Sequence, residues 1–142
     1  MQEQRNMISV HSRLPFDYCS SVLRETLRQS GLEVVSELAV HREVQRKLGL
    51  PVSKCTVFTV WDPLLMYHAL TAEKELPYCA PFNIAVCEDG PWSTVLAPRP
   101  SGPGFGAGQV GATLIARTTE GKIMKILASV SGAGAPKVAL RL

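Results

Sequence analysis

The chain has 142 residues, of which 46% are hydrophobic and 19% charged, as in a single globular domain. It contains no apolar run of about eighteen residues, so we expect no membrane span, and its N-terminus lacks the apolar stretch of a secretory signal. The formal net charge is only +3. The basic segment 101–142 has a single aromatic residue, so we expect no nucleic-acid binding. Since we expect neither a membrane span nor a secretory signal, we predict a soluble, cytoplasmic protein.

The first two predicted elements are a strand and a helix with marked ends. Residues 7–14 alternate in polarity, which predicts a strand. The segment that follows has an apolar stripe at helical spacing. Asp17 is placed to cap its first turn, and Gly31 is placed to end it in a left-handed conformation. The sequence therefore predicts a helix between these two residues.

Two further strands are predicted on either side of a short helix. Residues 32–40 are typical of a strand, and Val40, Val44 and Leu48 lie on one side of a helix that ends at a glycine. Residues 54–61 are almost wholly apolar or β-branched. This composition favours a strand in the centre of its sheet.

The junction after strand 54–61 is the strongest candidate for a site. Asp62 is a favourable N-cap and Pro63 suits the first helical position, so we expect a helix over residues 63–73. His68 falls away from the apolar side of that helix. We interpret it as solvated or packed at an edge rather than as catalytic.

The C-terminal part begins with a predicted hairpin. Residues 83–88 and 92–97 are strand-like, and the Asp-Gly-Pro sequence between them predicts a turn. After a glycine- and proline-rich loop at 98–108, helical periodicity predicts a last helix over 112–130. We expect residues 131–142 to form a flexible tail.

Two patterns that often carry chemistry lack their usual context. The Gly-x-Gly-x-x-Gly motif at 106–111 follows a loop rather than a strand, with no acidic residue about twenty positions later, so it predicts no dinucleotide site. Four cysteines and three histidines are scattered without Cys-x-x-Cys or His-x-x-x-His spacing. We therefore expect no metal and no cofactor, and we interpret the thiols as reduced and structural.

Three segments, in this order and at this spacing, resemble the domain of unknown function 302 family: "LEVVSELAVHREVQRKLGL", "VWDPLLMYHAL" and "APFNIAVCED". The likeness runs over residues 8–98 and more loosely through the last helix. It implies an α+β, two-layer sandwich with helices packed on one sheet, it suggests a homodimer, and it implies no established activity. With the predicted elements, this gives one mixed five-stranded sheet, element order βαβαβαββα, in a single domain of residues 1–130.

The chain departs from the family pattern at two places. The family usually has Cys-Asn-Pro at the junction and Pro-Cys-Asn before the hairpin. This chain has Trp-Asp-Pro at 61–63 and Pro-Phe-Asn at 81–83. Both family cysteines are thus replaced by large aromatic residues, and any redox or metal chemistry that relatives perform with them would be lost here.

We predict a binding domain rather than an enzyme. A pocket at the junction would combine an aromatic wall with hydrogen-bonding groups, from Trp61, Asp62, Tyr67, His68 and Asn83. Its occupant would be an unidentified small molecule; otherwise the domain would bind a partner, or dimerise through a sheet edge or the last helix. The alternative is a small enzyme with Asp62 or His68 as general base, but the sequence shows no set of nucleophile, base and orienting residue.

Overall fold

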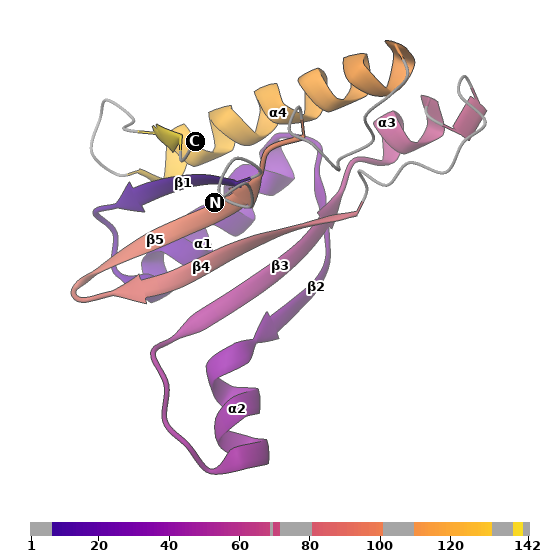
Figure 1. The fold of residues 1–142 in the computed structure, drawn as a ribbon. Coiled ribbons are helices and arrows are strands. Elements are labelled where there is room, and N and C mark those ends of the chain that lie inside the picture. Colours follow the sequence, from indigo (N-terminus) through magenta and orange to yellow (C-terminus); the bar gives the residue numbers. More distant parts are fainter. Residues whose placement is uncertain (1–6, 69, 72–80, 101–109, 132–137, 141–142) are drawn as a thin grey trace.

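A computed structural model of the chain describes residues 7–68, 70–71, 81–100, 110–131 and 138–140. Within these residues, one sheet is covered on one face by two helices (Figure 1). The α+β class expected from the sequence is confirmed.

The sheet has the strand order β2-β3-β4-β5-β1-β6, and every neighbouring pair is antiparallel. The strands are β1 (Met7–Ser12), β2 (Glu33–Ala39), β3 (Cys55–Trp61), β4 (Phe82–Asp89), β5 (Trp92–Pro98) and β6 (Val138–Leu140). The expectation of a mixed sheet is therefore wrong. A parallel pair needs a connection that crosses back over the sheet, whereas β2 and β3, and likewise β3 and β4, are consecutive strands that pair antiparallel.

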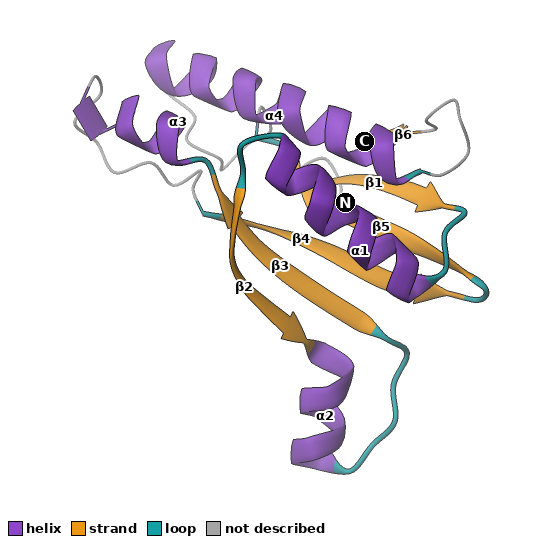
Figure 2. Ribbon diagram, turned by 180° about the vertical axis from the view of Figure 1, so that it is seen from behind, coloured by secondary structure: helices purple, strands orange, loops and turns teal. Residues whose placement is uncertain are grey.

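Two helices form the second layer. They are α1 (Phe16–Gln29) and α4 (Val110–Val130), which contact each other and the same side of the sheet (Figure 2). The shorter helices α2 (Val40–Leu48) and α3 (Pro63–His68) extend beyond the ends of the strands, and α2 buries none of its residues. None of the helices in the described ranges has the length and apolar character needed to cross a membrane.

The two ends of α1 differ in how well the sequence predicted them. The cap by Asp17 is wrong, because the helix begins one residue after Pro15, and no side chain makes an N-cap hydrogen bond to its first turn. Asp17 is then already inside that turn. The glycine end is confirmed, since Gly31 has φ 79° and the N–H of Leu32 donates to the carbonyl of Leu27 at 3.1 Å. This bond brings Leu32 back onto the helix, as a glycine C-cap does.

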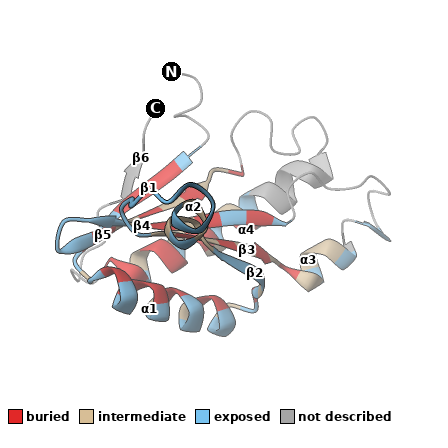
Figure 3. Ribbon diagram, turned by 90° about the horizontal axis from the view of Figure 1, so that it is seen from below, coloured by how far each residue is buried: buried red, intermediate tan, exposed pale blue. Residues whose placement is uncertain are grey.

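The core lies between the sheet and the two helices. Alternate side chains of β1, β3, β4 and β5 point into it, and Figure 3 shows the buried positions gathered between these layers. Its largest fully buried side chains are Ile8, Val10, Leu23, Leu27, Phe58, Val60, Ile84, Val86, Val95, Ile123, Ile126 and Leu127. Burying one face and leaving the other uncovered is common for antiparallel sheets.

The intervening strand positions form the second face of the sheet, which no described helix covers (Figure 1). We call it the open face. Register places on this face Met7, Ser9, His11, Leu38, Cys55, Val57, Thr59, Trp61, Asn83, Ala85, Cys87, Thr94, Leu96 and Pro98. Much of it is apolar, including Leu38, which is 50% exposed.

Candidate functional site

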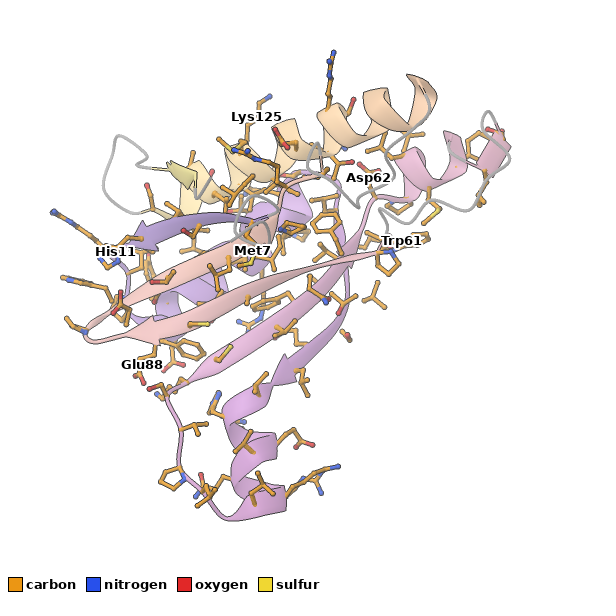
Figure 4. All side chains as sticks on the ribbon, in the orientation of Figure 1. Met7, His11, Trp61, Asp62, Glu88 and Lys125 are labelled. Carbon is orange, nitrogen blue, oxygen red and sulfur yellow. The ribbon has the colours of Figure 1, made fainter. Side chains whose placement is uncertain are left out.

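Asp62 links the junction to the helical layer. One of its carboxylate oxygens accepts the N–H of Leu65 at 3.1 Å, so the predicted helix cap is confirmed. The other oxygen accepts a charge-assisted hydrogen bond from Nζ of Lys122 on α4. Asp62 is only 4% exposed, and Figure 4 shows it close to α4. Both carboxylate oxygens are therefore engaged within the protein.

Trp61 and Asn83 lie on the open face instead. Nε1 of Trp61 donates to a carboxylate oxygen of Glu33 at 3.1 Å, and the Thr59 hydroxyl donates to Oδ1 of Asn83 at 2.7 Å. Thr59 is directly opposite Asn83 in the sheet, so Trp61 and Asn83 are diagonal neighbours on one face. The structure brings these two residues together and turns Asp62 away from them.

The other predicted site residues belong to α3. Tyr67 is 62% exposed, and the side chain of His68 lies outside the described part of the structure. A concavity of about 470 Å³ does lie on the open face, and it includes Asn83 together with Met7, Val57, Pro81, Phe82, Ala85, Leu96, Ala97 and Pro98. Its lining is mostly apolar.

Sequence reasoning missed a second concavity, on the helical side of the sheet. It has a volume of about 420 Å³ and is lined by residues of α1, β2, the start of α2, and β3 with the residue before it. We call it the charged pocket. Its lining residues are Phe16, Asp17, Ser20, Ser21, Arg24, Glu37, Ala39, His41, Arg42, Lys54 and Thr56.

Two ion pairs cross the charged pocket. The guanidinium of Arg24 donates to both carboxylate oxygens of Glu37, each at 2.9 Å, and this hydrogen bonding raises the pKa of Arg24. The ammonium of Lys54 lies 3.8 Å from a carboxylate oxygen of Asp17. Both pairs join α1 to the β2–β3 side of the pocket.

His41 and Phe16 form the aromatic part of the pocket. Their rings meet edge to face, with centroids 5.8 Å apart, and the Lys54 ammonium lies 5.9 Å from the Phe16 centroid. Nδ1 of His41 lies 3.1 Å from both the main-chain nitrogen and the main-chain oxygen of Cys55. The main chain of β3 therefore fixes the imidazole in either tautomer.

The pocket carries an excess of positive charge. Three cationic side chains (Arg24, Arg42 and Lys54) line it against two carboxylates (Asp17 and Glu37). Arg24 and Lys54 are paired, whereas no ion pair of Arg42 falls within the described residues. Arg42 therefore presents a guanidinium that can receive an anion.

The sequence contains only a faint signal of this pocket. Asp17, Ser20, Ser21 and Arg24 recur at helical spacing and form a polar stripe beside the apolar side of α1. Such a stripe usually faces solvent. The sequence does not predict that residues of β2 and α2 lie next to it and form a pocket with it. In the part of the chain that the structure describes, no three His, Cys, Asp or Glu side chains gather closely enough to hold a metal ion.

Comparisons with known proteins agree with this architecture. The family model for the domain of unknown function DUF302 matches residues 8–130. A crystal structure of an uncharacterized conserved protein DUF302 from Bacillus stearothermophilus is similar, with a TM-score of 0.72 and 19% identity over 87% of this chain and 97% of that chain. At this identity the likeness concerns the fold. A search of curated proteins found no match. Because the family model spans most of the sequence, the chain belongs to the family of the domain of unknown function DUF302.

Proposed function

We propose that the protein is a non-catalytic binding domain whose charged pocket holds a small anionic molecule. The observation that supports this most is the pocket's third cation, Arg42, which adds a positive charge to two internally paired ones. The volume of about 420 Å³ falls within the range of roughly 300–1,000 Å³ that is usual for small-molecule sites.

The lining indicates the chemistry of the ligand. A guanidinium binds carboxylate or phosphate through two parallel hydrogen bonds, which favours Arg42 as the anchor. Phe16 and His41 offer an aromatic wall beside it. The Ser20 and Ser21 hydroxyls donate to main-chain carbonyls within α1, so in this arrangement they do not donate to the anionic group and can accept only from a donor elsewhere on the ligand. We infer a carboxylate- or phosphate-bearing molecule with a compact apolar part.

Catalysis is less well supported by the same geometry. Asp62, one of the two general bases considered, already accepts hydrogen bonds on both carboxylate oxygens and is buried. Within the charged pocket, the Ser20 hydroxyl donates to the carbonyl of Phe16 rather than to His41. The described pocket residues therefore include no hydrogen-bonded pair of nucleophile and base, which acyl-transfer chemistry would need.

A thermal-shift screen tests the proposal. The full chain is melted with a panel of small carboxylates and phosphates, and each hit is titrated by calorimetry. We expect a saturable stabilisation that Arg42→Ala abolishes. Arg46→Ala is the matched control, because Arg46 lies on the same helix but pairs with Glu43 and does not line the pocket. Equal weakening by both variants, or no hit in the panel, would contradict the proposal.

A second candidate is self-association through the open face, with another copy of the chain as the partner. It is favoured by the apolar side chains exposed there, such as Met7 at 39% and Leu38 at 50%, because patches of this kind often mark protein interfaces. Leu96→Glu places a charge in the middle of this face and should convert a dimer to a monomer in light scattering. Val52→Glu, at an exposed position before β3, is the control. A wild-type monomer at all concentrations would exclude this candidate.

A further inference from the structure

Two cysteines face each other on the open face. Cys55 at the start of β3 is directly opposite Cys87 in β4, and their sulfur atoms are 3.3 Å apart. Both are free thiols and both are half-buried. They lie at the ends of these strands away from the 61–63 junction, so they are distinct from the two cysteine positions of the family pattern that carry aromatic residues here.

The backbone around them has the geometry that a disulfide needs. The N–H of Glu88 donates to the carbonyl of Lys54 at 2.8 Å, so Lys54 and Glu88 are a hydrogen-bonded pair. The main-chain nitrogen and oxygen of Cys55 contact His41 instead of β4. Cys55 and Cys87 are therefore a non-hydrogen-bonded pair, in which Cα atoms are about 4.5 Å apart. Disulfides span Cα separations of roughly 4.4–6.8 Å. Rotation of the side chains alone can bring the sulfur atoms to bonding distance.

We propose that Cys55 and Cys87 form a reversible disulfide by exchange with a low-molecular-weight disulfide. The Cys55 thiolate attacks one sulfur of that molecule, forming a mixed disulfide and expelling one thiolate, which takes up a proton. Cys87 then loses its proton to solvent and attacks the sulfur of Cys55. This breaks the mixed disulfide and expels the second thiolate. Two protein thiols are oxidised, and one small disulfide is reduced to two thiols.

The order of these steps follows from the surroundings of Cys87. Burial, followed by the hydrogen bond and the charge of Cys55, raises the pKa of Cys87 to about 12. Cys87 therefore keeps its proton while Cys55 is a free thiol or thiolate. Once Cys55 is in a mixed disulfide, its charge and its thiol hydrogen bond are gone. Two of the three causes that hold the proton on Cys87 then disappear, and the second attack becomes easier.

Cys19 provides an internal control. It lies in the core on the helical side of the sheet and is 0% exposed, and burial is the main reason that its pKa is raised. The side chains near its sulfur are the hydroxyls of Ser12 and Ser93, which lower its pKa. A small disulfide has no access to it in the folded protein, so Cys19 should remain a thiol.

Peptide mapping tests the proposal. The full chain carrying Cys79→Ser is incubated with oxidised glutathione, alkylated and digested with trypsin, so that peptides 55–74 and 75–117 each contain one cysteine. We expect these two peptides to be joined, with the loss of two hydrogen atoms, and to separate after dithiothreitol. If Cys79→Ser folds poorly, the unmodified chain cut additionally with chymotrypsin at Phe82 gives the same assignment.

A second variant tests the order of attack. Cys87→Ser, in the same background, should stop at a glutathione adduct on Cys55. The proposal is overturned if Cys55 and Cys87 are both fully alkylated after oxidised glutathione, or if a stable adduct on Cys55 never converts when Cys87 is present. A cross-link that involves Cys19 would also overturn it.

Discussion

Replacing Asp62 with alanine should destabilise the protein by more than the loss of a helix cap. Loss of an N-cap side chain costs about 1 kcal/mol. The hydrogen bond to the Lys122 ammonium adds about 1.5–3 kcal/mol, as for bonds to charged groups. The Lys122 side chain is 32% exposed, so in the variant its ammonium can be hydrated instead. The lower end of this energy range therefore applies. We expect a loss of about 2–3 kcal/mol, or a fall in Tm of roughly 10 °C for a domain of this size.

A double-mutant cycle separates the two contributions. Lys122→Met removes the ammonium but keeps the aliphatic stem, and Asp62→Ala is measured alone and in combination with it by urea unfolding. We expect a coupling energy of about 1–2 kcal/mol, as is typical of residues that share a hydrogen bond. Lys125→Met, at an exposed position on the same helix, is the control and should not couple. A coupling energy below about 0.3 kcal/mol, within the additivity of independent sites, would refute the ion pair.

Three further predictions follow from local features. Gly31→Ala should cost about 1 kcal/mol in urea unfolding, because Gly31 has φ 79° and alanine is strained there; an unchanged midpoint would mean that the helix ends differently. Cys55→Ala should lower the raised pKa of Cys87 and speed its alkylation near neutral pH, since Cys55 is one cause of the shift; an unchanged rate would show that burial acts alone. Limited proteolysis should cut first within residues 98–108, because that sequence is rich in glycine and proline; early cleavage within β3 or β4 would contradict this.

The elements of this fold were predictable where the determining residues are close in sequence. Asp62 and Pro63 predict the start of α3. The Asp62 carboxylate accepts a hydrogen bond from the N–H of Leu65, which is only three residues later in the sequence. Gly31 ends α1 through a bond between Leu32 and Leu27. Alternation in polarity identified β1, composition identified β2 and β3, and a turn sequence between strand-like segments identified β4 and β5; all of these are local properties of the sequence.

Features that depend on the path of the chain between elements were not predictable. The strands β2, β3 and β4 pair antiparallel. Their directions depend on where the segments that connect them return to the sheet, and no residue within the strands determines that. Lys122 lies sixty residues after Asp62, so their pairing required the packing of α4. The charged pocket combines residues of α1, β2, α2 and β3. The sequence around Arg42 does not indicate which residues of the other elements lie next to it.

If the charged pocket is the binding site, an anion binds beside Arg42 and not elsewhere on the protein. An amide NMR titration of the ¹⁵N-labelled chain with the tightest anion from the panel reports that position residue by residue. Binding in the charged pocket predicts that the largest shifts occur at Ser20, Arg24, His41, Arg42 and Lys54. These shifts should saturate together and should be lost in Arg42→Ala. Shifts concentrated on the open face around Asn83, or spread over the surface without saturation, would contradict the account.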